Sequence, residues 1–163
     1  MAGYILALDQ GTTSSRAILY DDQARPIKIV QKPTRLQTPK ADHVEQDAQQ
    51  IWQTQISCAH DVINQAGLLA TDVSSIAITN QRESIVIWDK KTGRALAPAI
   101  IWQDRRTAQY CQSLAQREAD KRFVSDANDS LAQQVQHITG LRLDPYFSAS
   151  KIAWLLDNIP NLR

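Results

Sequence analysis

The sequence predicts an α/β protein, and three features of its order along the chain lead to this prediction. Short apolar segments typical of buried strands alternate with longer segments whose apolar residues recur at helical spacing. The first three strand segments follow one another through short turns, which predicts an antiparallel meander. A helical segment then leads to a fourth strand, and a helix is the usual link between parallel strands.

The meander is expected over Tyr4–Leu8, Ser15–Tyr20 and Pro26–Lys32, with a turn at Asp21–Asp22. Asp47 is a good N-cap for a helix that runs to about Ala66, and Gly67 supplies its C-terminal stop. The apolar residues of this helix step by four, three and four positions, which places them on one face: Trp52, Ile56, Ala59 and Ile63. The next strand is expected over Ser75–Thr79.

The second half of the chain is expected to be more helical. Two strands, 85–88 and 97–102, should pair around a turn at 91–93. Asp104 should cap a helix that ends near residue 118, and a polar excursion is expected at 120–129. A helix over 131–138 should end at Thr139-Gly140. Ser148 should cap a last helix that Pro160 terminates.

Composition excludes several classes of protein. The formal net charge of the 163 residues is +1, which offers no broad attraction to nucleic acid or to an anionic membrane. The first apolar run is too short for a secretory signal or a membrane span, so we expect a cytoplasmic protein. Two cysteines without C-x-x-C spacing and three scattered histidines suggest neither a disulfide framework nor a metal site.

A first motif, Asp9-Gln-Gly-Thr-Thr-Ser-Ser-Arg16, lies between two expected strands. Gly11 allows a tight turn and a close approach of backbone to phosphate, and successive N–H groups in such a turn bind anions. Asp9 could hold Mg²⁺ together with phosphate oxygens, and Arg16 could balance charge on a transferred phosphoryl group. A hairpin turn with surface hydroxyls is the simpler interpretation of an isolated D-x-G. The full eight-residue string favours the phosphate site.

A second motif, Thr79-Asn-Gln-Arg-Glu-Ser84, follows the fourth strand. Arg82 presents a rigid fork of donors and Glu83 accepts hydrogen bonds only. Together they match a small polyol, whose hydroxyls both donate and accept. A surface ion pair is the alternative for an arbitrary Arg-Glu pair.

Two further segments complete the pattern: Ile101-Trp-Gln-Asp-Arg-Arg-Thr107 and Thr139-Gly-Leu-Arg-Leu-Asp-Pro-Tyr-Phe-Ser148. With all four in this order, the chain resembles the N-terminal portion of the glycerol kinases, in the FGGY family of carbohydrate kinases. Ser84 stands where Thr is common, and Ala149-Ser150 where Gly-Thr is usual. The polar stretch from about residue 120 to 134 looks longer than in relatives, which leaves its role open.

The resemblance implies a ribonuclease-H-like ATPase core of the actin and hexokinase type and an enzyme that uses ATP and Mg²⁺ to convert glycerol to sn-glycerol 3-phosphate. Asp9 would face the magnesium. The ATP phosphates would contact Thr12, Thr13, Ser14 and Arg16. Glycerol would contact Arg82, Glu83, Trp102 and Tyr146. A buried Trp or Tyr is the structural alternative for the last two. Trp52, Trp88 and Trp154 are expected to pack.

The resemblance also implies that residues 1–163 form a partial N-terminal kinase domain. In the family, the general-base Asp of a Gly-Asp-Gln segment and the nucleotide-binding C-terminal domain lie beyond the position of Arg163. The chain is therefore expected to be a truncated fragment, inactive alone, of an enzyme that is a homo-oligomer. Two alternatives stay open: a kinase for another polyol or sugar, and a non-catalytic module that kept the fold.

Overall fold

The computed structural model describes residues 3–117, 130–160 and 162. The polar excursion expected at 120–129 lies outside these residues. The chain forms two compact units. Unit 1 comprises Met1–Gln37 and Glu45–Ile101, and unit 2 comprises Thr38–Val44 and Trp102–Arg163.

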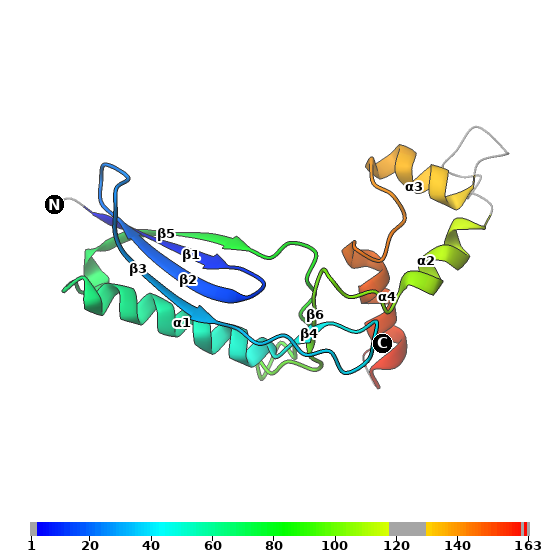
Figure 1. Cartoon of the computed structure of the whole chain (residues 1–163), viewed down its shortest axis with the longest axis horizontal. Coiled ribbons are helices and arrows are strands. Elements are labelled where there is room, and N and C mark those ends of the chain that lie inside the picture. Colours follow the sequence, from blue (N-terminus) through cyan, green and yellow to red (C-terminus); the bar gives the residue numbers. More distant parts are fainter. Residues whose placement is uncertain (1–2, 118–129, 161, 163) are drawn as a thin grey trace. The chain divides into compact units, whose positions relative to one another are not determined.

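Unit 1 is built on a four-stranded sheet with the order β3-β2-β1-β5 (Figure 1). The strands β1 (Tyr4–Gln10), β2 (Ser14–Tyr20) and β3 (Pro26–Pro33) form the predicted antiparallel meander. The strand β5 (Val73–Asn80) follows a short 3₁₀ helix, η1 (Ala70–Asp72), and pairs parallel to β1. The predicted α/β class and the parallel connection are therefore both confirmed.

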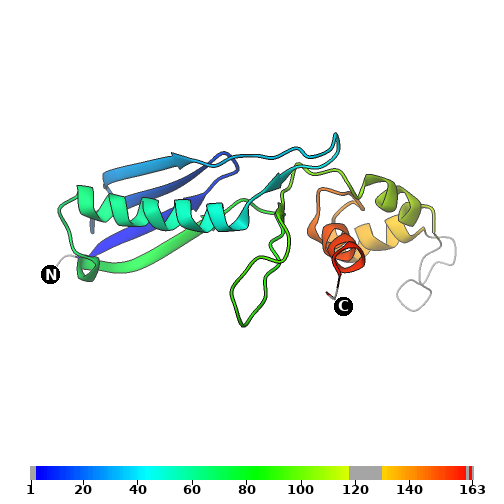
Figure 2. The ribbon, with the colours of Figure 1, turned by 90° about the horizontal axis from the view of Figure 1, so that it is seen from below.

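The helix α1 (Ala48–Gln65) covers one face of this sheet (Figures 1 and 2). The inward residues of β1 and β2 alternate with outward ones, as the two-residue period of a strand requires. They meet α1 in a core of five buried side chains: Leu6, Ala17, Leu19, Cys58 and Val62. Lys32 at the end of β3 pairs with Asp61 of α1 at 2.6 Å, which ties the helix to the sheet at its margin.

Both predicted ends of α1 are confirmed. The carboxylate of Asp47 accepts hydrogen bonds from the backbone N–H groups of Gln49 and Gln50, at 2.8 and 3.3 Å, and satisfies donors that the first turn leaves unpaired. Gly67 follows the helix with φ of 69°, which glycine adopts at little cost. The predicted packing of Trp52 is wrong, because its side chain is 62% exposed and the buried face passes through Cys58 and Val62.

A second, two-stranded sheet pairs β4 (Glu45–Gln46) with β6 (Ala99–Ile100). The strand expected at 97–102 is confined to β6, and the strand expected at 85–88 is reduced to isolated bridges, Ile85 with Ile100 and Trp88 with Ala95. Pro98 has no N–H to donate to a ladder, which limits the pairing of this segment. The predicted pairing is thus correct in direction, but the predicted strand lengths are wrong.

Unit 2 contains α2 (Ala108–Ala115), α3 (Leu131–Thr139) and α4 (Ser148–Asn158). The prediction for α3 is confirmed, including its C-terminal Gly140 with φ of 73°. The two predicted N-caps are wrong: Thr107 precedes α2 where Asp104 was expected, and Phe147 precedes α4 where Ser148 was expected. Among the helices described, none is both long enough and apolar enough to span a membrane.

The buried thiol of Cys58 predicts a pH-dependent loss of stability. Burial among the apolar side chains between α1 and the sheet raises the pKa of Cys58 above its usual value of 9.0. Unfolding therefore releases a proton in alkaline solution, and the free energy of unfolding should fall as pH rises above about 9.

The Cys58→Ser variant places a non-ionising group at the same position, so its unfolding free energy should fall less steeply with pH. Urea denaturation of both proteins between about pH 7 and about pH 10 measures the two slopes. Equal slopes would show that this thiol does not control the pH dependence.

Candidate functional site

Two loops leave the sheet of unit 1 at the same edge. β1 and β5 run parallel, with Asp9 opposite Thr79 and Gln10 opposite Asn80, so their carboxyl ends coincide. The turn after β1 carries the hydroxyl-rich motif, and the loop after β5 carries Arg82 and Glu83. Ligands of open α/β sheets bind outside the carboxyl ends of strands, which makes this edge the candidate site.

The turn that follows β1 is tight. The N–H of Gly11 donates to the carbonyl oxygen of Ser14 at 3.0 Å, and a Cβ at Gly11 would come within 3.2 Å of that oxygen. The Gly11 N–H is thus used inside the turn. The hydroxyl of Ser15 is also turned inward, where it donates to Gln10 Oε1 at 2.7 Å. Thr12, Thr13 and Ser14 are at least partly exposed.

Asp9 and Arg16 form an ion pair across β1 and β2, on the sheet face opposite α1. They are direct partners in the strand register, and both Nε and Nη2 of Arg16 donate to Asp9 Oδ2, with an Nε distance of 3.1 Å. Ser14 shares this face, and its Oγ accepts from Gln31 Nε2 at 2.8 Å. The side chains expected to handle phosphate and metal therefore lie next to one another.

The residues present suit a magnesium ion held mainly by a ligand's phosphates. In the described parts of the chain, no three carboxylate, histidine or cysteine groups come close enough to bind a metal. Asp9 supplies a single carboxylate, and Mg²⁺ is commonly bound by one or two carboxylates with substrate phosphates and water. The structure is thus compatible with the expected role of Asp9, which remains a prediction.

The loop after β5 holds one residue in an unusual conformation. Glu83 has φ of 63°, in the left-handed region, which costs a residue with a Cβ about 1–2 kcal/mol. Such positions persist where the surroundings fix the backbone, and they occur often at ligand sites. Arg82, next to it, is exposed to solvent.

Two glutamines that the sequence analysis did not single out connect these loops. Gln81 Nε2 donates to Gln46 Oε1 at 2.7 Å, and Gln46 Nε2 donates to the carbonyl oxygen of Thr12 at 2.8 Å. Gln46 is 1% exposed although its side chain is polar. It lies in a two-residue strand just before a helix cap, and no local pattern distinguishes it from a surface glutamine.

Unit 2 brings Trp102 and Tyr146 together. Their ring centroids are 6.1 Å apart with planes at 68°, an edge-to-face contact. Asp144 holds the local turn, because its Oδ1 accepts from the Tyr146 N–H at 2.7 Å and from Arg105 Nη1 at 3.1 Å. Trp102 is 36% exposed, and Tyr146 is partly exposed. Arg82 and Glu83 belong to unit 1.

Unit 2 also contains a buried ion pair. Arg106 donates twice to the Asp104 carboxylate, from Nε at 2.9 Å and Nη2 at 2.8 Å, and the two side chains are 2% and 1% exposed. Asp104 Oδ2 also accepts from the Val44 N–H at 2.7 Å. The Arg106 guanidinium lies 4.5 Å from the ring centroid of Trp154. Trp154 therefore packs as predicted, and Asp104 is a structural anion rather than a helix cap.

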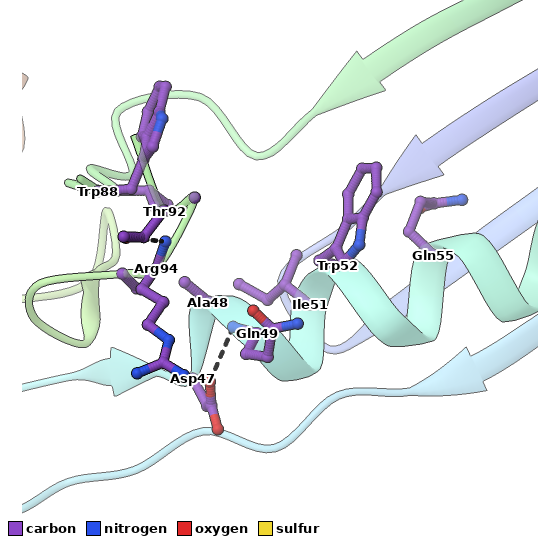
Figure 3. Close-up of a pocket in the computed structure, with 12 residues that line it drawn as sticks. Asp47, Ala48, Gln49, Ile51, Trp52, Gln55, Trp88, Thr92 and Arg94 are labelled. Atoms are coloured by element: carbon purple, nitrogen blue, oxygen red, sulfur yellow. Dashed lines mark hydrogen bonds between the residues drawn. The ribbon is translucent and has the colours of Figure 1, made fainter. Parts of the chain in front are cut away.

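A groove in unit 1 lies between the start of α1 and the 86–95 hairpin, with a volume of about 1120 Å³. Figure 3 shows Trp52 and Trp88 on its walls, from α1 and from the hairpin. Trp88 is 59% exposed, so its predicted packing is also wrong. None of the predicted site residues lines this groove.

The mixed sheet and the two loops at its edge match a domain known from carbohydrate kinases. A profile described as "FGGY family of carbohydrate kinases, N-terminal domain" matches residues 4–163. The chain belongs to the FGGY family of carbohydrate kinases. It is 50% identical over 160 residues to a glycerol kinase of Acinetobacter baylyi and 49% identical over 161 residues to one of Deinococcus radiodurans.

These alignments cover 98% of this chain and 30% and 29% of the two relatives, so the chain spans about 30% of their length. Among solved structures, a Plasmodium falciparum glycerol kinase with ADP superimposes with a TM-score of 0.75 at 28% identity, over 98% of this chain and 29% of that one. A gluconate kinase from Lactobacillus acidophilus superimposes with a TM-score of 0.77 at 23% identity, over 97% and 29%. The predicted family and fold class are confirmed.

The buried pair in unit 2 predicts a large effect on stability. Asp104→Ala leaves Arg106 buried without this carboxylate, and removal of one partner of a buried pair costs about 3–5 kcal/mol. Urea denaturation followed by circular dichroism measures the loss. As a control, Arg25→Ala removes an exposed arginine from a surface pair with Asp21 and should change stability little. Equal small losses would contradict the assignment of Asp104.

Proposed function

We propose that this chain is the N-terminal part of an ATP-dependent glycerol kinase, which forms sn-glycerol 3-phosphate. The identity of 50% with a glycerol kinase over nearly the whole chain carries the proposal. The two loops at one edge of the sheet support it, because a phosphate-binding turn and a polyol-binding loop must lie near each other for phosphoryl transfer. Residues 1–163 are proposed to form a partial kinase domain.

In this proposal, a glycerol hydroxyl oxygen attacks the γ-phosphorus of ATP, the bond to the β-phosphate oxygen breaks, and ADP leaves. The phosphates contact Thr12, Thr13, Ser14 and Arg16. The ion pair with Asp9 holds the Arg16 guanidinium on the sheet face opposite α1, which Ser14 shares. A magnesium ion bound with the help of Asp9 would neutralise phosphate charge. The proton of the attacking hydroxyl needs a general base, and we assign none within this chain.

The polyol is proposed to contact Arg82 and Glu83 through its hydroxyls and Trp102 and Tyr146 along its carbon skeleton. The guanidinium donates and the carboxylate accepts, so the first pair serves both hydrogen-bonding roles of a hydroxyl. The edge-to-face rings supply an apolar wall with one phenol hydroxyl. A cytoplasmic location and a homo-oligomeric enzyme complete the proposal.

An assay of ATP-dependent glycerol phosphorylation tests this function. The protein from the complete reading frame is compared with the 163-residue chain, and ADP release is measured with glycerol, other polyols and pentuloses. Glycerol should be the preferred substrate of the longer protein, and the 163-residue chain should be inactive because it spans about 30% of the length of its relatives. Preference for another sugar, or turnover by the short chain, would contradict the proposal.

Two substitutions should affect different kinetic constants of that enzyme. Arg82→Ala removes donors to glycerol and should raise the KM for glycerol about tenfold or more. Asp9→Asn removes the charge that binds the metal and positions Arg16, and should lower kcat about 100-fold.

Matched controls are the exposed residues Arg25 and Asp22 in the β2–β3 turn, as Arg25→Ala and Asp22→Asn. Both control variants should leave KM and kcat unchanged. If Arg82→Ala behaved like Arg25→Ala, the assignment of the polyol loop would be wrong. If Asp9→Asn behaved like Asp22→Asn, the assignment of the phosphate turn would be wrong.

A further inference from the structure

We infer that Gln46 is a positioning residue that fixes the phosphate turn and the polyol loop relative to each other. This inference rests on the proposed function and extends it to a residue that touches neither substrate. Gln46 belongs to β4, outside both loops, and its side chain is 1% exposed. A buried amide must satisfy its hydrogen bonds within the protein, so its partners are determined by the fold.

On one side, the Gln46 amide is bonded to the phosphate turn. Its Nε2 donates to the carbonyl oxygen of Thr12 at 2.8 Å and to Thr34 Oγ1 at 3.3 Å. Thr34 contributes to the same contact, because its hydroxyl donates to the Thr12 carbonyl at 3.1 Å and its N–H donates to the Thr13 carbonyl at 2.9 Å. Two consecutive carbonyls of the turn thus point toward Gln46 and Thr34. These hydrogen bonds from Gln46 and Thr34 fix the orientation of the turn.

On the other side, the Gln46 amide is bonded to the polyol loop. Its Oε1 accepts from Gln81 Nε2 at 2.7 Å, and Gln81 Oε1 accepts from Ser84 Oγ at 3.2 Å. Gln81 and Ser84 flank Arg82 and Glu83. The hydrogen bond between Gln81 and Ser84 closes the loop around the strained Glu83, whose φ is 63°. The same chain of bonds therefore stabilises the conformation that presents the two proposed glycerol ligands.

The chemistry at Gln46 requires an amide of this length. The side chain must accept one hydrogen bond and donate two, which neither a carboxylate nor an apolar side chain does. A methionine matches its length without the hydrogen bonds. Gln46→Met leaves the Thr34 hydroxyl bonded to the Thr12 carbonyl but removes the acceptor of Gln81. Both loops should lose their common support.

Steady-state kinetics of the protein from the complete reading frame test the inference. Gln46→Met should raise the KM for ATP and the KM for glycerol, each about tenfold, with a smaller change in kcat. Gln81→Met keeps the bonds between Gln46 and the phosphate turn, so it should raise the KM for glycerol and leave the KM for ATP near its original value. In the double variant the rise in the glycerol KM should be less than the product of the two single effects.

A control variant distinguishes the proposed positioning role of Gln46 from a purely structural one. Val62→Ala removes buried apolar atoms from α1 in the same unit, and should lower the melting temperature without a change in either KM. If Gln46→Met behaved like Val62→Ala, with a lower melting temperature and both KM values unchanged, the inference would be wrong. If Gln46→Met did not fold, the Gln81→Met variant would still decide the link to the polyol loop.

Amide hydrogen exchange of the unliganded protein provides a test that needs no activity. Gln46→Met should speed exchange about tenfold in peptides that cover residues 11–14 and 80–84, and Gln81→Met should do so in the second peptide alone. Unchanged exchange in both peptides would overturn the inference even in an active glycerol kinase. Faster exchange in a protein that phosphorylates no glycerol would refute the proposed function and leave the positioning role in place.

Discussion

The parallel pairing of β1 with β5 is the constraint on which the candidate site depends. Its register sets Gln10 opposite Asn80, so the turn after one strand and the loop after the other begin at the same edge of the sheet. A parallel pair needs a crossover, and α1 supplies it while covering one face of the sheet with Cys58 and Val62. The opposite face stays free for Asp9 and Arg16, whose ion pair lies between β1 and β2.

Polar contacts within unit 1 then fix the conformations of the two loops at this shared edge. A buried glutamine between two loops is costly unless each of its hydrogen bonds is made, and Gln46 makes them to both loops. The unit thus contains a buried polar side chain at Gln46 and a left-handed residue at Glu83. Strain and buried polarity of this kind are expected where a site has to be held in one conformation.

In unit 2, a buried ion pair has the corresponding structural role. Asp104 and Arg106 are almost fully buried two residues apart, and the carboxylate also accepts the backbone N–H of Val44. The pair links the segment before α2 to a distant part of the chain, and the guanidinium covers the ring of Trp154. Asp144 plays a comparable part for Tyr146, whose ring meets that of Trp102. Local acidic residues therefore position the aromatic side chains of this unit.

The sequence by itself determined the elements whose signals are local. The meander, α1 with its Asp47 cap and the glycine stops at Gly67 and Gly140 follow from strand alternation, capping chemistry and φ preference. The four motifs also identified the family. Only the tertiary structure decided the roles of Gln46 and Asp104 and the exposure of Trp52, because burial depends on which distant segments meet. A glutamine before a cap and an aspartate before a helix have the same local pattern on a surface and in a core, and long-range packing alone tells them apart.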